Sequence, residues 1–261
     1  MAEPGRSALE EALRARRDGG GRAFVPYVTG GLPGVDAALL RGLEEAGADA
    51  IEVGIPFSDP VMDGGVIQEA SRRALEAGAR PADVLRLVAA AGLGIPVAVM
   101  TYLNPVLRGG VGSFLAEAAA AGVSGAIVPD LPVDEAGDFA RAGREAGVGA
   151  VMLAAPGSTP ERLRAIAGLA GGFVYCVATY GVTGERDALA STAQEVVSAL
   201  RPLTDLPLLV GVGIGTPEHA WQACRFADGV IVGSALVRPL LSGDRSGALE
   251  LAGRFRAAIP A

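Results

Sequence analysis

The chain alternates short apolar runs with longer stretches in which apolar and charged residues recur at helical spacing. A stretch that ends in Ala-Gly or a similar pair is followed within a few residues by a run such as Ala50–Val53 or Gly125–Val128. This alternation is typical of parallel strands joined by helices. We predict eight strands, near residues 23–28, 49–53, 96–101, 125–128, 149–153, 172–176, 207–211 and 229–232.

A (β/α)8 barrel consists of eight strand–helix units over about 250 residues, which is the number predicted here. A doubly wound open sheet is the competing fold, but the regularity up to the last strand favours closure. Ser7–Arg17 begins with the capping-box pattern Ser-Ala-Leu-Glu and predicts an extra helix before the first strand. Further helices are expected at Val35–Ala46 and Arg245–Ala258. No linker interrupts the pattern, so we expect residues 1–261 to form one domain.

The composition narrows the chemistry that such a barrel can perform. All 22 cationic residues are arginine, which excludes Schiff-base chemistry on a lysine, including attachment of PLP. The only histidine, His219, follows Thr216-Pro217-Glu218, so we expect it in the first turn of an exposed helix. With a single histidine, a metal site with several histidines, a catalytic His dyad and a Ser-His-Asp triad have almost nothing to be made from. Catalysis must therefore rest on carboxylates, tyrosine hydroxyls and backbone N–H groups.

The charge and the apolar runs bear on partners and location. The net charge of −7 argues against nucleic acid or an anionic membrane as a partner. No apolar run is long enough to span a bilayer, and the polar N-terminus is no signal peptide. We expect a cytoplasmic protein in which Cys176 and Cys224 are buried, reduced thiols.

Glycines after the last two predicted strands indicate an anion-binding site. Gly211-Val212-Gly213 and Gly233-Ser234 would let backbone N–H groups approach a phosphate, and Ser234 would open a short helix. The alternative is that these glycines only end strands. Their occurrence after both strands, where barrels commonly bind phosphate, favours a phosphorylated small molecule.

Glu52 and Asp63 are the candidate acid–base pair. Glu52 lies near the end of an apolar strand, where loss of hydration would raise its pKa and let it donate and accept a proton near neutral pH. Each residue has a simpler interpretation: Glu52 could pair with an arginine inside the barrel, and Asp63 could cap a helix or form a turn.

A long loop follows the sixth predicted strand, over residues 177–190. It contains Gly181-Val182-Thr183-Gly184. Glycines on both sides of the pair Val182-Thr183 suit a lid that closes over a site and excludes water. A solvated surface loop is the alternative interpretation.

Several motifs together closely resemble the tryptophan synthase alpha subunit family over nearly the whole chain. They are Phe24–Thr29, Glu52–Pro60 with Asp63-Gly64, Pro129–Val133, Gly181–Gly184, Gly211–Ile214 and Gly233–Ala235. The resemblance implies a TIM barrel, a lyase that cleaves indole-3-glycerol phosphate to indole and glyceraldehyde 3-phosphate in L-tryptophan biosynthesis. It also implies an alpha2-beta2 complex with a beta subunit that carries PLP, and no cofactor in this chain.

The resemblance also implies a role for each matched site residue. Glu52 would protonate the indole ring carbon and take the proton of the glycerol hydroxyl, Asp63 would hold the indole N–H, and Tyr175 would position the substrate. Thr183 would close onto Asp63. The remaining expected substrate-binding residues are Tyr27, Met100, Tyr102 and Ile127 around the indole, Gly213, Gly233 and Ser234 at the phosphate, and Gly184, Gly211 and Val212. Loops Ile55–Asp63 and near Asn104 would face the beta subunit.

The chain departs from the family pattern at a few positions. Leu32 stands where Asp is frequent, Gly65 where Pro is usual, and Val212 where Phe is common, while Thr179-Tyr180 replaces smaller or basic residues. These departures leave a stand-alone lyase that supplies free indole as an alternative. A different phosphate-binding barrel, such as a sugar-phosphate isomerase, and a scaffolding subunit that only binds phosphate are the other hypotheses. Intact Glu52 and Asp63 argue against the scaffold.

Overall fold

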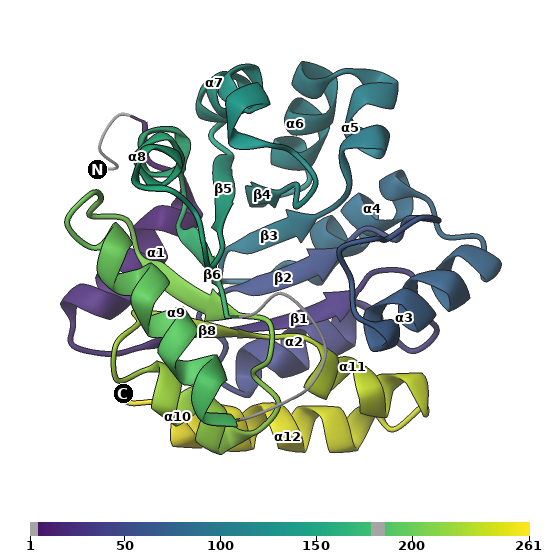
Figure 1. Ribbon diagram of the computed structural model, residues 1–261. Coiled ribbons are helices and arrows are strands. Elements are labelled where there is room, and N and C mark those ends of the chain that lie inside the picture. Colours follow the sequence, from purple (N-terminus) through teal and green to yellow (C-terminus); the bar gives the residue numbers. More distant parts are fainter. Residues whose placement is uncertain (1–4, 179–185) are drawn as a thin grey trace.

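The computed structural model describes residues 5–178 and 186–261, with the backbone alone for residues 186–191. Within this part of the chain, eight parallel strands close into a barrel in sequence order, which confirms the predicted barrel and excludes the open sheet (Figure 1). The strands are β1 (Ala23–Thr29), β2 (Ile51–Gly54), β3 (Val97–Met100), β4 (Val123–Ile127), β5 (Gly149–Ala154), β6 (Val174–Val177), β7 (Leu208–Gly211) and β8 (Gly229–Val232).

Helices surround the barrel and cover the outer face of its strands (Figure 1). The helices of the described residues are α1 (Ala8–Asp18), α2 (Ala37–Glu45), α3 (Gly65–Glu76), α4 (Pro81–Ala91), α5 (Leu103–Gly109), α6 (Val111–Ala120), α7 (Gly137–Ala146), α8 (Pro160–Leu169), α9 (Arg186–Leu200), α10 (Pro217–Ala223), α11 (Ser234–Leu241) and α12 (Arg245–Ala258). A 3-10 turn lies at Val133–Glu135. None of these helices is long and apolar enough to cross a membrane.

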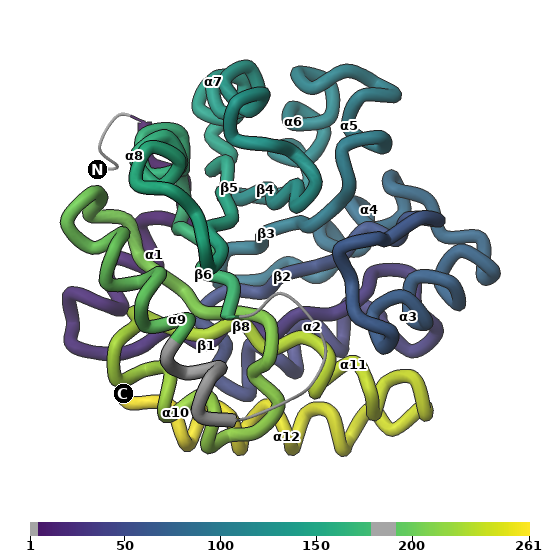
Figure 2. Tube along the Cα trace, viewed as in Figure 1, coloured from purple at the N-terminus to yellow at the C-terminus, as the bar shows by residue number. Residues whose placement is uncertain are grey.

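Local capping sets several of these boundaries. The helix predicted over Val35–Ala46 begins at Ala37, because the Asp36 carboxylate accepts the N–H of Leu39 at 2.8 Å and ends the extended segment before it. The last helix has the predicted bounds. It packs against α2, while α11 packs against α3, so the last βα unit of the chain lies beside the first ones (Figure 2).

Alternate residues of the strands point inward and fill the barrel. The interior cluster is apolar, and Met100, Leu153 and Ala155 pack against it. Its members are Leu9, Leu13, Ala23, Val25, Ala50, Ala98, Ile127, Val151, Phe173, Tyr175, Val177, Leu209 and Ile231. Cys176 and Cys224 are both buried and free, as predicted.

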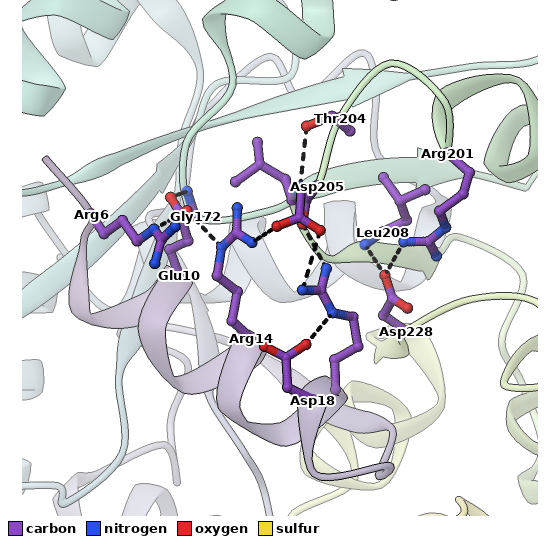
Figure 3. Close-up of polar contacts among 12 residues, drawn as sticks. Arg6, Glu10, Arg14, Asp18, Gly172, Arg201, Thr204, Asp205, Leu208 and Asp228 are labelled. Carbon is purple, nitrogen blue, oxygen red and sulfur yellow. Dashed lines mark hydrogen bonds and ion pairs between the residues drawn. The ribbon is translucent and has the colours of Figure 1, made fainter. Parts of the chain in front are cut away.

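The extra helix α1 closes one end of the barrel. Leu9 and Leu13 belong to the interior cluster, and Leu9 approaches Gly125 so closely that a Cβ there would lie 2.3 Å from Leu9 Cδ2. Figure 3 shows the polar contacts that hold α1 in place: the Glu10 carboxylate accepts the Gly172 N–H at 3.4 Å, and Arg14 pairs with Asp205. With this end filled, the other end, where the strands finish, is left for the site.

Candidate active site

Glu52 is the buried acid of the barrel interior. It lies on β2 opposite Tyr27 of β1 and Ala98 of β3, and it is only 1% exposed. Among the described residues its Oε2 has no hydrogen-bond partner, so the alternative of a buried arginine partner has no support. An unsatisfied carboxylate oxygen in a barrel interior is costly, and such groups concentrate at functional sites.

Burial and, to a smaller extent, the negative charge of Asp63 together raise the pKa of Glu52 to about 8. Burial also raises the pKa of Asp63, to about 6, while a hydrogen bond from the Tyr102 hydroxyl opposes that rise. Asp63 therefore ionises first, and its charge then keeps the proton on Glu52. At neutral pH the site holds one protonated and one ionised carboxyl group, which suits acid–base chemistry.

Asp63 lies in the loop between β2 and α3 and does not cap the helix. Gly64 occupies the N-cap position of α3, and the cap has no side-chain hydrogen bond. The simpler interpretation of Asp63 as a capping residue is therefore wrong. Its carboxylate instead accepts a hydrogen bond from the Tyr102 hydroxyl.

Tyr102 fixes the loop that carries Asp63. Its hydroxyl oxygen accepts the N–H of Met62 at 2.9 Å, and its ring stacks on Phe57 with the centroids 5.2 Å apart. Because the same hydroxyl donates to Asp63, a single side chain ties the end of β3 to the loop after β2. Nothing in the sequence pattern indicates this contact.

Tyr27 and Tyr175 enter the site from β1 and β6. Both are buried, and burial raises the pKa of each phenol well above its ordinary value. The charges of Glu52 and Asp63 add to that rise at both tyrosines, so all four side chains share one electrostatic environment. Ile127 belongs to the interior cluster and Met100 packs against it, which gives this site an apolar wall.

The predicted phosphate region lies after β7 and β8. Val212 and Gly213 follow β7 in the left-handed conformation, with φ of 63° and 93°. Gly233 is the N-cap of α11, no side chain caps that helix, and Ser234 is its first residue, as expected. Backbone N–H groups at such a helix start have no helical partner and can bind an anion.

Gly211 also makes room for a tyrosine. A Cβ on Gly211 would lie 2.3 Å from Tyr175 Oη, so this glycine admits the hydroxyl at the end of β7. Thr183 and Gly184 lie outside the described residues, as do Thr179 and Tyr180, so the lid stays a prediction.

The sequence profile described as tryptophan synthase alpha chain matches residues 13–252. The chain belongs to the tryptophan synthase alpha chain family. A tryptophan synthase alpha chain from Carboxydothermus hydrogenoformans is 45% identical over 235 residues, with 88% of each chain covered. Another from Halorhodospira halophila is 44% identical and covers 97% of this chain and 94% of its own.

A solved structure of Mycobacterium tuberculosis tryptophan synthase superposes with a TM-score of 0.89 at 40% identity, covering 98% of this chain and 99% of its own. Membership of the tryptophan synthase alpha chain family confirms the resemblance seen in the sequence motifs. It disfavours the sugar-phosphate isomerase and the scaffolding subunit, and the names of these relatives give no support to a stand-alone lyase.

Proposed function

We propose that Glu52 moves the protons in the cleavage of indole-3-glycerol phosphate, with Asp63 as its electrostatic partner. As a tryptophan synthase alpha chain the protein is a lyase that acts on this substrate. The observation that carries the residue assignment is the burial of Glu52, with one unpartnered carboxylate oxygen, on an inward position of β2. No other buried acid on an inward strand position of the described barrel is left unpaired in this way.

The reaction begins with proton transfer from the Glu52 carboxyl group to the indole ring carbon that bears the glycerol chain. This protonation leaves positive charge on the ring nitrogen, and the ionised Asp63 accepts the N–H and stabilises that charge. The ring carbon thereby becomes able to accept the electrons of the bond that is to break.

In the second step the Glu52 carboxylate takes the proton of the hydroxyl on the adjacent glycerol carbon. The carbon–carbon bond breaks, its electrons restore the indole ring, and the hydroxyl-bearing carbon becomes the aldehyde of glyceraldehyde 3-phosphate. Glu52 ends protonated, as it began, so the proton balance closes. Tyr175 would position the substrate beside Glu52, and Gly213, Gly233 and Ser234 would hold the phosphate.

We further propose a beta subunit as partner, in an alpha2-beta2 complex in the cytoplasm, with PLP bound only by that subunit. Exposed apolar side chains support this interface, because Val61, Met62 and Leu107 are 78%, 54% and 55% exposed. Val61 and Met62 directly precede Asp63 in its loop, and Leu107 lies on α5, the helix that begins after Tyr102. Apolar side chains this exposed are typical of protein interfaces when they gather together.

The deciding experiment measures indole release from indole-3-glycerol phosphate by the wild-type chain and by Glu52→Gln. We expect the variant to lose at least about 100-fold in kcat, the range for general acid–base catalysis. Glu117→Gln, an exposed position, is the matched control and should keep full activity. An active Glu52→Gln variant, or a wild-type chain inactive with and without a beta subunit, contradicts the proposal. An alpha chain whose rate is unchanged by the beta subunit would favour the stand-alone lyase.

A further inference from the structure

The turn after β7 is held in an unfavourable backbone conformation. Val212 is the only non-glycine residue at positive φ in the described part of the chain, and Gly213 beside it is also left-handed. A β-branched residue is particularly disfavoured there, because its Cβ substituents crowd the backbone. Such conformations persist only where the surrounding structure holds them.

Packing of Val212 itself contributes little to holding the turn. Its side chain is 49% exposed, although it lines one edge of a pocket between β7, α9 and α10. His219 and Gly213 line the same pocket. Ile214 of the same turn packs against the core, and a hydrogen bond to the backbone of the turn can restrain it further.

His219 supplies such a bond. Its Nδ1 accepts the N–H of Gly215 at 3.3 Å, which requires an unprotonated Nδ1. Its own backbone N–H donates to Oγ1 of Thr216, the N-cap of α10, at 3.2 Å. The imidazole is thus fixed to α10 through its backbone and to the turn through its side chain. The sequence pattern predicts that His219 lies in the first turn of an exposed helix, whereas in the structure this residue is half-buried.

We propose that His219 is a positioning residue for phosphate binding, which acts by holding the Val212–Gly215 turn through the Gly215 N–H. The inference rests on the proposed function, because it assigns this turn to the substrate phosphate. Gly213 lies two residues before the restrained N–H, so rotation of the turn would redirect the Gly213 N–H away from the anion. Glu52 and Asp63 lie on and after β2 and do not depend on this bond.

This separation predicts a specific kinetic signature. Loss of the His219 acceptor should weaken binding of the phosphate group and leave the proton transfers intact. His219→Leu removes the acceptor at similar volume, and we expect KM for indole-3-glycerol phosphate to rise about 3- to 10-fold, the range for one hydrogen bond. The Kd for inorganic phosphate, measured by calorimetry on the wild-type and variant chains, should rise by the same factor. The kcat should stay within about twofold.

His219→Asn is the conservative variant, because its Oδ1 can take the place of Nδ1 as acceptor. It should restore KM and the phosphate Kd to within about twofold of wild type, a rescue that depends on the acceptor alone. Gln222→Leu is the matched control, since Gln222 lines the same pocket but bonds to Glu218 on its own helix. His219→Ala tests the same loss without adding an apolar group, should the leucine variant fold poorly.

Unchanged KM and phosphate Kd in both His219→Leu and His219→Ala would overturn the inference. So would a failure of His219→Asn to restore them, because the ring and not its acceptor would then matter. A wild-type chain that binds phosphate in a His219-dependent manner but releases no indole contradicts the proposed function alone. A chain that releases indole with the KM unaffected by these variants contradicts this inference alone.

Discussion

Gly54 lies directly against the hydroxyl of Tyr27: a Cβ placed on Gly54 would be 2.1 Å from Tyr27 Oη. Tyr27 is in turn the register partner of Glu52, so the glycine determines where the tyrosine ring lies beside the buried acid. The Tyr175 hydroxyl has the same relationship with Gly211 at the end of β7. Two strand-end glycines thus leave space for two phenols of the site.

Gly54→Ala should therefore destabilise the fold and disturb the site together. The added methyl group collides with a buried ring, and overpacking of this kind costs about 1–3 kcal/mol. We expect the free energy of unfolding in urea to fall by that amount, and indole release to fall because Tyr27 is displaced beside Glu52.

A double-mutant cycle separates the collision from other effects. Combining Gly54→Ala with Tyr27→Leu should cost less stability than the sum of the two single changes, since the smaller side chain removes the clash. Gly253→Ala in α12 is the control, because a Cβ there meets nothing within 4 Å. Additive losses in the cycle would show that the close approach of Gly54 to Tyr27 is not the cause.

Replacing Glu52 by Gln should change how stability depends on pH. The ordinary pKa of 4.5 is raised to about 8 in the folded chain. Between these values the unfolded chain has lost the proton and the folded chain has kept it, so wild-type stability falls as pH rises through this window. Glu52→Gln lacks this ionisation. As pH rises between those two values, the free energy of unfolding of the variant should therefore increase relative to that of the wild type. Urea unfolding across the window tests this; parallel curves would contradict the raised pKa.

The fold was predictable because its signals are local. Apolar runs and helix caps repeat along the chain, so all eight strands were found, and α12 was found with the observed bounds. The second strand was predicted to start at Asp49 but starts at Ile51. The Asp49 carboxylate accepts the Phe24 N–H at 2.8 Å and pairs with Arg256 at 3.0 Å, contacts between distant segments that no local pattern reveals.

The residues of the candidate site also differ in this way: some carry a local sequence signal, and others are placed by contacts between distant segments. Glu52 could be predicted because an acid inside an apolar strand conflicts with its surroundings, and the glycines after β7 and β8 follow the pattern of phosphate-binding barrels. The contacts of Tyr102 with Met62 and of His219 with Gly215 could not. Both join a side chain to a backbone N–H, and every residue type except proline could supply that donor.

Gly65→Pro should stabilise the chain. Gly65 is the first residue of α3, where proline is favoured, and the preceding Gly64 has φ −74° and ψ 160°, which a residue before proline adopts readily. A Cβ on Gly65 meets nothing within 4 Å. We expect about 0.4–1 kcal/mol of added stability from the restricted unfolded chain, measured by urea unfolding. Gly65→Ala should give a smaller gain, and a less stable proline variant would show that this helix start needs its flexibility.

Tyr102→Phe should shift the acidic limb of the pH–rate profile. The Tyr102 hydroxyl donates to Asp63 and holds the pKa of that carboxyl group down against the effect of burial, at about 6. If the ionised form of Asp63 holds the indole N–H, activity is lost as pH falls through this pKa. Without the hydroxyl the pKa rises, so kcat/KM should begin to fall at a pH higher by up to about one unit.

The basic limb should stay where it is, because it follows loss of the Glu52 proton near pH 8. Asp63→Asn should remove the acidic limb altogether, and Tyr27→Phe should leave it in place, since the Tyr27 hydroxyl bonds to Thr29 at 3.3 Å instead. If Tyr102→Phe leaves the acidic limb unmoved while Asp63→Asn abolishes it, the hydroxyl does not tune Asp63. Tyr102 would then act only through Met62, as a support for the loop, and its loss would change substrate affinity at every pH alike.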